Sequence, residues 1–376
     1  MMVTIAGHNI YTGLGFGSEV VYSMLRANEH SLALRENTFD LPESFVASLF
    51  DRDEIDNRFG RRSGAELTHL EKAMILSAED AIAMSGIDAA SPRTIFIISS
   101  TKGNVELLEH APNGEDSRLP LWHSARTVTE FFGNKNEPIC VTNACTSGIC
   151  AQIVAKRAIE INGYENAVVI GADFLSKFIV SGFQSLKALS PERCRPFDRD
   201  RRGLNLSEGV STIVLSSSEK GMGIELEAGC IRNDANHISA PSRYAIGQTA
   251  AIEAILDEDI SRDLAFINLH GTATLYNDSM ESVALHNCGL DAVPAVSYKS
   301  MIGHTLGAAG VIETVISCLA LIEGVVFPTI GYEECGVQYP LNLSSQTRFV
   351  SGGRFMKIMS GFGGINAATL YRRIGE

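Results

Sequence analysis

The chain has 376 residues, of which 45% are hydrophobic, and its formal net charge at pH 7 is −13. This length is enough for two or three domains with a large core, while the acidic balance argues against broad nucleic-acid binding, which needs a basic face. The eight cysteines contain no Cys-x-x-Cys pair, so neither a disulfide framework nor a zinc site of that spacing is expected.

The sequence contains no recognisable targeting segment. Residues 1–8 lack the basic region and the long apolar core of a signal peptide. The longest apolar run, residues 311–328, contains Glu313 and Glu323, so we predict no membrane span. Cysteines without a disulfide pattern are typical of a reducing compartment, and we therefore predict a cytoplasmic protein.

Strand-like and helix-like runs alternate along the chain. The first glycine-rich segment, Gly13-Leu-Gly-Phe-Gly17, lacks the complete fingerprint of dinucleotide-binding sites, so we interpret it as a structural turn. The strand-like runs lack a regular apolar–polar alternation, which indicates strands buried on both faces. This order predicts an α/β architecture with mainly parallel sheets. Helices are predicted at 65–85, 242–256, 280–285 and 306–322, and strands at 94–99, 167–170, 211–215, 265–269 and 295–298.

A sequence pattern that occurs twice indicates two related halves. Cys145-Thr-Ser-Gly148 precedes an apolar helix-like run that ends near Gly163, and His304-Thr-Leu-Gly307 precedes another that ends near Gly324. The polar, glycine-bearing stretch 216–223 is a plausible linker between the halves. We therefore divide the chain into an N-terminal half, residues 1–217, and a C-terminal half, residues 218–376.

Cys145 is the candidate nucleophile. It lies in Val141-Thr-Asn-Ala-Cys-Thr-Ser-Gly148, between a strand-like and a helix-like run. The unpaired N–H groups of a helix start favour a thiolate over a thiol, and small neighbours leave room for a thioester. A lone cysteine is more often an inert core residue, but this context predicts an ionised nucleophile.

His270 should lie at the carboxyl end of the predicted strand 265–269, which is where sites form in parallel α/β sheets. Thr272 and Thr274 follow it at alternating positions and offer hydroxyl groups to a ligand. A lone histidine at a strand end is more often structural. The Gly-Thr-Ala-Thr context favours a functional one.

Two further glycine-rich motifs follow. The first, residues 299–310, combines a cation, His304 and small residues, and a neutral imidazole there could donate to a developing oxyanion. In the second, residues 361–364, backbone N–H groups could serve an oxyanion and Phe362 could gate a pocket. The alternatives are a structural helix start and a tight turn with a core phenylalanine. One cysteine and two histidines on tight turns together indicate acyl transfer through a thioester.

Two basic clusters interrupt the acidic chain. They are either docking patches for a small acidic partner or solvated, salt-bridged surface. The first cluster is Arg58, Arg61 and Arg62, and the second is Arg193, Arg195, Arg199, Arg201 and Arg202.

Taken together, these motifs resemble the β-ketoacyl-ACP synthases of the thiolase-like superfamily, in particular the Cys-His-His elongating class. The resemblance implies a five-layered α-β-α-β-α fold of two pseudo-symmetric halves and an obligate dimer. It implies a 3-oxoacyl-[acyl-carrier-protein] synthase, which performs a decarboxylative Claisen condensation of an acyl-cysteine with malonyl-ACP. It covers nearly the whole chain and includes Thr101-Lys-Gly103, Asn143 to Gly148, Pro196-Phe-Asp198, Arg202-Gly203, Glu208-Gly209, Asp234, His237, Pro241, His270 to Thr274, Asn277-Asp278, Glu281, Lys299 to Gly310 and Gly361 to Asn366.

The resemblance also implies roles for the reacting residues. Cys145 would take the acyl chain from an acyl carrier protein. His270 and His304 would hold the malonyl thioester oxygen and stabilise the enolate that forms when carbon dioxide leaves. Backbone N–H groups of Cys145 and Phe362 would form the oxyanion hole. No cofactor and no metal are implied, because the phosphopantetheine arm arrives on the carrier protein.

Other residues would support them. Lys299 and Glu281 would organise the charges around His304, and Thr272 and Thr274 would contact the phosphopantetheine arm. Ser360 stands where the family often has an aromatic residue, and we predict that it contacts substrate. This departure and a short interval between Cys145 and His270 are closer to ketosynthases of aryl-polyene or related type II polyketide pathways.

Three other functions are alternatives to this interpretation. A thiolase needs a second catalytic cysteine near its C-terminus, but the last cysteine is Cys335. An initiating synthase would carry a Cys-His-Asn set, against which His304 argues. A non-catalytic chain-length-factor-like subunit remains the alternative function, although such subunits usually lack the cysteine; iodoacetamide labelling of Cys145 distinguishes the two. The predicted partners are an acyl carrier protein and either a second copy of the chain or a chain-length-factor-like paralogue.

Overall fold

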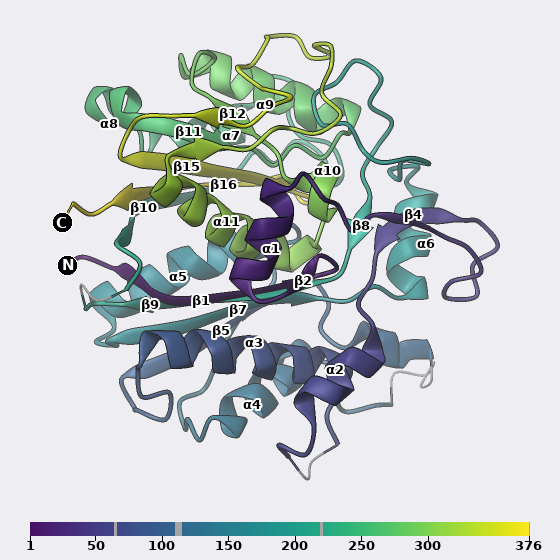
Figure 1. The fold of residues 1–376 in the computed structure, drawn as a ribbon, viewed down its shortest axis with the longest axis vertical. Helices are drawn as coiled ribbons and strands as arrows, with labels where there is room; N and C mark the ends of the chain where they lie inside the picture. Colours follow the sequence, from purple (N-terminus) through teal and green to yellow (C-terminus); the bar gives the residue numbers. More distant parts are fainter. Residues whose placement is uncertain (64–65, 110–114, 219–220, 376) are drawn as a thin grey trace.

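The computed structural model describes residues 1–63, 66–109, 115–218 and 221–375. The chain forms five layers, in which two sheets alternate with three layers of helices (Figure 1). The predicted α-β-α-β-α layering is confirmed. One outer layer contains α2 (Arg52–Phe59), α3 (His69–Ser85) and α4 (Leu121–Phe131); the central layer contains α5 (Ser147–Ile161) and α11 (Ala309–Glu323); the other outer layer contains α7 (Ile246–Glu253), α8 (Glu258–Asp263) and α9 (Leu275–Asn287).

The two sheets have the same internal order. In each of them the first three strands are antiparallel neighbours and the last three are parallel neighbours. They join where Thr4 pairs with Glu225. The first order is β1 (Thr4–Thr12), β9 (Gly209–Ser216), β7 (Asn166–Asp173), β5 (Thr94–Ser99) and β6 (Ile139–Val141); the second is β10 (Ile224–Asn233), β16 (Ile365–Arg373), β15 (Arg354–Gly361), β11 (Leu264–Asn268) and β12 (Ala295–Val296).

The expectation of mainly parallel sheets is wrong, because half of these neighbouring pairs are antiparallel. The β15–β16 pair is a hairpin, whose turn uses Gly363 at φ 88° and Gly364 at φ 77°. Such a connection can only join antiparallel strands. The proposed boundary at 217/218 falls between β9 and β10. Residues 219–220 of the predicted linker lie outside the described residues.

Helix boundaries follow local capping. The structure begins α3 at His69, later than predicted, because Thr68 caps it. The Thr68 hydroxyl accepts from the Glu71 N–H at 3.2 Å, and the Glu71 carboxylate accepts from the Thr68 N–H at 3.0 Å, which forms a capping box. Residue 65, the predicted start, lies outside the described residues.

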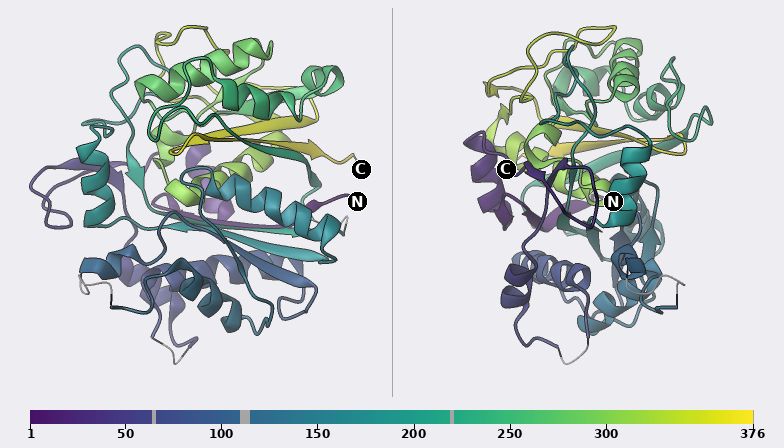
Figure 2. Two further views of the ribbon diagram at one scale, coloured as in Figure 1. Left: turned by 180° about the vertical axis from the view of Figure 1, so that it is seen from behind. Right: turned by 90° about the vertical axis from the view of Figure 1, so that its right-hand side faces the viewer.

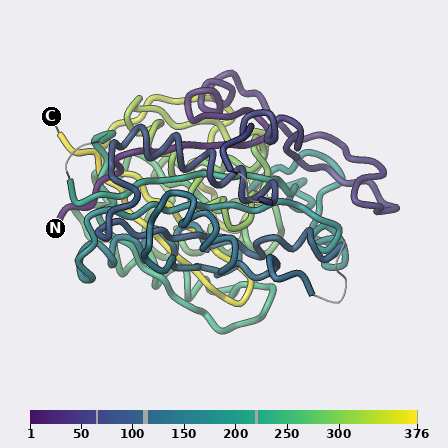
Figure 3. Tube along the Cα trace, turned by 90° about the horizontal axis from the view of Figure 1, so that it is seen from below, coloured from purple at the N-terminus to yellow at the C-terminus, as the bar shows by residue number. Residues whose placement is uncertain are grey.

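The remaining elements are short and lie around the layers. The Gly13–Gly17 segment forms the turn from β1 into β2 (Gly15–Phe16), as predicted. A small sheet of β3 (Ala33–Arg35), β4 (Phe45–Ser48) and β8 (Leu206–Ser207) lies at the end of the molecule opposite both termini (Figures 1 and 3). The others are α1 (Ser18–Arg26), α6 (Lys177–Ser185), α10 (Lys299–Ile302), β13 (Val325–Val326), β14 (Arg348–Phe349) and the 3₁₀ turns Val105–Glu109 and Leu306–Ala308.

The central helices α5 and α11 touch at glycines. A Cβ added to Gly148 would lie 2.8 Å from the Val311 nitrogen, and one added to Gly310 would lie 2.5 Å from the Ile149 nitrogen. No larger side chain fits there without moving a backbone. Both helices run between the two sheets (Figure 2). The segment Leu306–Glu323 is long and apolar enough to cross a membrane, but 83% of it is buried inside the molecule, as expected for a core helix.

Candidate active site

The structure brings Cys145, His270 and His304 together. The Sγ of Cys145 lies 3.1 Å from Nε2 of His304. The two imidazole rings have centroids 5.1 Å apart and planes at 84°. One sulfur and one ring nitrogen from each histidine all lie within 4.8 Å of one another. Residues as far as 159 positions apart in the sequence therefore form one cluster, to which each half of the chain contributes.

A strained turn presents Cys145. Ala144 just before it has φ 48°, a left-handed conformation that residues with a side chain rarely adopt. The turn is held by Ser147, whose hydroxyl donates to the Ala144 carbonyl at 2.6 Å and accepts from the Asn143 N–H at 2.8 Å. The glycine-rich segment 361–364 lies against this turn, since a Cβ added to Gly361 would lie 3.3 Å from the Cys145 nitrogen.

The predicted ionisation of Cys145 is wrong for this structure. Burial raises the pKa of its thiol to about 11, although Lys299 and Lys102 act in the opposite direction. Part of the side chain faces a cavity, yet protein surrounds it on every other side. Helix α5 begins at Ser147, so Cys145 precedes the first helical turn and gains less from its dipole. The thiol is thus the dominant form at neutral pH.

This ionisation state predicts how Cys145 reacts with iodoacetamide. Only the thiolate is alkylated, and its fraction rises about tenfold per pH unit below the pKa. We expect the rate at Cys145 to keep rising from about pH 7 to pH 10, whereas a free thiol of pKa about 8.5 levels off. Peptide mass spectrometry over a pH series measures this. A plateau near pH 8 would show that the His304 N–H outweighs burial.

His304 is held as a neutral hydrogen-bond donor. The Leu306 N–H donates to its Nδ1 at 3.1 Å, so the ring proton sits on Nε2, facing Cys145. Burial, followed by the charge of Lys299, holds the pKa of His304 well below its usual range. Because Nε2 carries a proton, it has no lone pair for a metal ion, although the spacing of the cluster would suit one.

The turn before His304 is equally close-packed. Gly303 has φ 75°, and a Cβ added there would lie 2.7 Å from Cβ of Ser207. The His304 N–H donates to the Asn205 carbonyl at 2.7 Å, and the His304 carbonyl accepts from the Ser207 N–H at 3.0 Å. These bonds tie a histidine of the C-terminal half to backbone of the N-terminal half.

His270 lies just beyond β11, as predicted. Its N–H and that of Gly271 donate to the two carboxylate oxygens of Glu281 at 2.6 and 2.7 Å. The prediction that Glu281 acts on His304 is therefore wrong. Glu281 instead fixes the backbone of His270. Nδ1 of His270 is buried without a hydrogen-bond partner among the described residues. Burial, then Lys299, His304 and Lys357, keeps the pKa of His270 well below its usual range.

Two buried residues were missed by sequence reasoning. Nζ of Lys299 lies 2.6 Å from Oε1 of Glu313, and Nζ of Lys357 lies 2.5 Å from its Oε2. All three side chains are at most 1% exposed. Glu313 was noted only as an interruption of an apolar run. A charged residue in an otherwise apolar helix or strand was the available signal, because such a charge must be paired.

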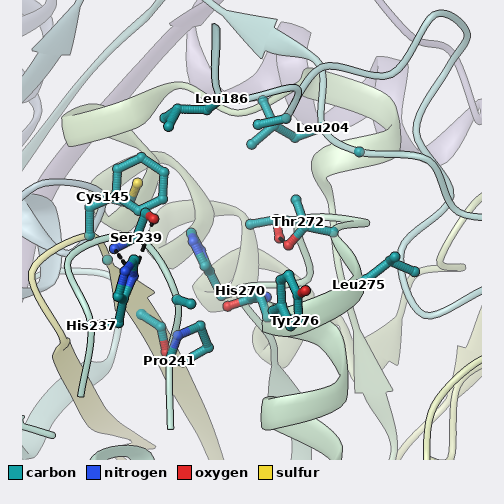
Figure 4. Close-up of a pocket in the computed structure, with 18 of the residues that line it drawn as sticks. Cys145, Leu186, Leu204, His237, Ser239, Pro241, His270, Thr272, Leu275 and Tyr276 are labelled. Carbon is teal, nitrogen blue, oxygen red and sulfur yellow. Dashed lines mark hydrogen bonds between the residues drawn. The ribbon is translucent and has the colours of Figure 1, made fainter. Parts of the chain in front are cut away.

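The cluster opens into a cavity of about 830 Å³. Figure 4 shows Cys145, His270 and Thr272 facing this space. The predicted residues Thr272, Thr274, Ser360 and Phe362 line it too. The hydroxyls of Thr272 and Thr274 lie 2.8 Å apart, so they form a polar pair beside His270.

Ser360 and Phe362 differ in what they offer the cavity. The Ser360 hydroxyl lies 2.8 Å from the amide oxygen of Asn366 and 3.1 Å from that of Gln248, so the protein already engages it. The Phe362 ring is 40% exposed and stacks on Phe183, with centroids 6.0 Å apart. An exposed ring at the cavity edge is consistent with a gate. The role of its backbone N–H stays a prediction.

Four of the eight arginines in the basic clusters form ion pairs with acidic residues in the described part of the chain. Arg58 pairs with Glu54 and Arg62 with Glu79 on the surface. Arg201 is buried and donates to the Gly336 carbonyl at 2.6 Å, so its role is structural and it is no part of a docking patch.

Comparisons with known proteins agree with this geometry. The family models "Beta-ketoacyl synthase, N-terminal domain" and "Beta-ketoacyl synthase, C-terminal domain" match residues 17–221 and 224–333. "Putative polyketide beta-ketoacyl synthase 1" of Streptomyces cyaneus is 29% identical, covering 98% of this chain and 97% of its own. "3-oxoacyl-[acyl-carrier-protein] synthase 2" of Vibrio harveyi is 33% identical, covering 67% and 66%.

Solved structures share the fold over the whole chain. A β-ketoacyl synthase from Burkholderia phymatum superposes with a TM-score of 0.88 at 26% identity, covering 100% of both chains. A ketosynthase (ApeO) in complex with its chain length factor (ApeC) from Xenorhabdus doucetiae gives 0.86 at 22% identity, covering 99% and 98%.

Proposed function

The chain belongs to the β-ketoacyl synthase family, and on this premise we propose how its site condenses an acyl group on Cys145 with a malonyl group on an acyl carrier protein. It is a condensing enzyme of the acyltransferase class, a 3-oxoacyl-[acyl-carrier-protein] synthase. The observation that carries the mechanism is the meeting of one thiol and two neutral imidazoles within 4.8 Å on one cavity.

The first step is transfer of the acyl group. Sγ of Cys145 attacks the thioester carbonyl, the carrier thiol leaves, and the proton of Cys145 ends on that thiol. The backbone N–H groups of Cys145 and Phe362 would hold the oxyanion of this step. Thr272 and Thr274 would contact the phosphopantetheine arm along the polar side of the cavity. Splitting the reaction in this way is covalent catalysis, which replaces one difficult step by two easier ones.

The second step is decarboxylation and carbon–carbon bond formation. His304 would donate from Nε2, together with His270, to the malonyl thioester oxygen. Carbon dioxide leaves, and the electron pair of the broken bond passes into an enolate. The enolate carbon attacks the acyl carbonyl, the bond to Sγ breaks, and Cys145 regains a proton from solvent. Neutral imidazoles suit this role because they remain donors over the whole neutral range.

The proposed partners are an acyl carrier protein and a second ketosynthase-like chain. Lys187, Arg202 and Arg243 line the cavity beside the exposed rings of Tyr244 and Tyr276, so its mouth is basic and apolar. A basic mouth would attract an acidic carrier. In the described sheet β6 is an edge strand, which supports pairing with another chain. We keep open whether that chain is a second copy or a chain-length-factor-like paralogue.

We further propose a cytoplasmic location and no bound cofactor. The eight cysteines are all free, which supports a reducing compartment. The arm that carries both substrates arrives on the carrier protein, so the residues described here need only acid–base and hydrogen-bonding chemistry. Among the described residues, the presence of Cys145, His270 and His304 in one cluster favours an enzyme over a non-catalytic subunit.

Mass spectrometry tests the proposed function. The purified protein, incubated with a panel of acyl carrier proteins, should gain an acyl mass on the peptide that contains Cys145. Addition of malonyl-ACP should remove that mass and yield a β-ketoacyl carrier. A panel that leaves the protein unmodified, with no ketoacyl product, would overturn the proposal.

A further inference from the structure

A second buried ammonium lies directly behind the active site. Lys357, on β15, is completely buried, and its Nζ donates to the Leu269 carbonyl at 3.1 Å and to Glu313 at 2.5 Å. Leu269 is the residue immediately before His270. Lys357 therefore contacts the backbone that carries one of the two imidazoles.

Lys357 leaves the buried cluster with an excess positive charge. Glu313 is already paired with Lys299 at 2.6 Å, so two ammonium groups share one carboxylate. Burial lowers the pKa of Lys357 to about 8, while Glu313 opposes this shift. A buried charge is costly, and apolar side chains of similar volume often stabilise such a position better. Stability alone therefore does not explain this lysine.

We propose that Lys357 is a positioning residue for His270, which holds the end of β11 and supplies positive charge behind both imidazoles. This inference rests on the function proposed above and adds a residue to its machinery. The held carbonyl sets where the His270 ring points. The positive charge favours neutral, donating imidazoles and attracts the enolate that they bind.

The charged groups around His270 determine in which direction its pKa should shift when Lys357 is removed. The cations that disfavour its protonation are Lys299 and Lys357, with His304 acting in the same sense. On α9, Glu281 binds its N–H, and the pKa of Glu281 is raised to about 7, first by burial and then by Asp278. Glu313 on α11 pairs with Lys357, and the Cys145 sulfur lies within 4.8 Å of a ring nitrogen of His270. Removing Lys357 takes away one cation, so the pKa of His270 must rise.

The test compares Lys357→Met with the wild-type protein. We expect carbon dioxide release from malonyl-ACP to fall about 10- to 100-fold, because misplaced groups cost rates of this order. Acylation of Cys145 should persist. In the pH profile of carbon dioxide release, the acid limb should move to higher pH, because His270 is protonated more easily without the charge of Lys357. A merely structural role would lower the rate without moving that limb.

Two further variants separate charge from placement. Lys357→Gln keeps a donor for the Leu269 carbonyl, so it should show the same shift with a smaller loss of rate, and it replaces the methionine variant should that one not fold. Lys357→Met combined with Glu313→Gln restores one net positive charge, and it should return the limb towards wild type. Lys156→Met, on α5 and paired with Glu160, is the control for removing a lysine elsewhere.

NMR titration of labelled histidine gives a readout that does not need activity. The His270 pKa should be higher in Lys357→Met than in the wild type and unchanged in Lys156→Met. Equal His270 pKa values in the wild type and Lys357→Met would overturn the inference. A wild-type protein that neither forms an acyl-enzyme nor releases carbon dioxide would instead overturn the proposed function, and the titration would still decide the role of Lys357.

Discussion

His304→Ala is expected to lose decarboxylation of malonyl-ACP while keeping acylation of Cys145. The Nε2–H of His304 is fixed towards the reacting sulfur by the bond from Leu306 to Nδ1. It is therefore a ready donor to a developing oxyanion, and loss of such a donor costs about 100- to 1000-fold in rate. Acylation uses Sγ of Cys145 and the carrier thiol, neither of which the substitution removes. Carbon dioxide release and the mass of the acyl-enzyme measure the two steps separately.

His286→Ala is the matched control for this variant. His286 is half exposed, stacks on Tyr339 with ring centroids 3.7 Å apart, and does not line the cavity. It should release carbon dioxide at the wild-type rate. Unimpaired release by His304→Ala would remove His304 from the decarboxylation step and with it the assignment of the elongating class.

Cys145→Ala should give the reciprocal pattern. Without Sγ no acyl-enzyme forms, and condensation should fall at least about 1000-fold, because loss of a covalent nucleophile costs this much or more. Both imidazoles remain, so the variant should still release carbon dioxide from malonyl-ACP. Intact-mass measurement after incubation with acyl-ACP, followed by product analysis, reports both outcomes.

Cys140→Ala controls for the loss of a neighbouring thiol. Cys140 lies on β6, is partly buried and is absent from the cavity lining. It should be acylated at Cys145 as in the wild type. An acyl mass that persists in Cys145→Ala would place the nucleophile on another residue. Absence of any acylation in the wild type would favour the non-catalytic subunit.

Short motifs predicted the reacting groups because turn geometry restricts which residues fit. Ala144 and Gly303 occupy left-handed backbone next to Cys145 and His304, and only small residues tolerate the close contacts there. Such constraints leave a local record in the sequence. The cluster could therefore be predicted, although the distances within it depend on how both halves pack.

Long-range partners left no comparable record. Glu281 was expected at His304 but binds the backbone of His270, because α9 places its side chain under the end of β11. Lys357 and Glu313 are 44 residues apart and meet only when β15 and α11 pack together. The antiparallel pairing of the first three strands in each sheet was missed for the same reason, because a strand buried on both faces has the same apolar composition whether its neighbours are parallel or antiparallel.

The ionisation of Cys145 shows where a local argument fails. A helix start stabilises a thiolate, and that reasoning needs only the neighbouring residues. Burial has the opposite effect, and its magnitude depends on the surrounding protein, which the sequence does not reveal. In this structure burial is the largest influence on the pKa of Cys145. The direction of the shift could be known only after folding.

The glycine contact between α5 and α11 joins the two halves of the chain directly behind the reacting residues. The nucleophile belongs to one half and both imidazoles to the other, and each helix begins just after one of these reactive turns. At Gly148 and Gly310 the two helices are too close for any larger side chain. A larger side chain at either glycine would force the two helices apart. It would thereby increase the distance between the Cys145 sulfur and the imidazoles, while each half stayed folded. Activity thus depends on the contact between the two halves, and a variant with a larger side chain there should lose activity before it unfolds.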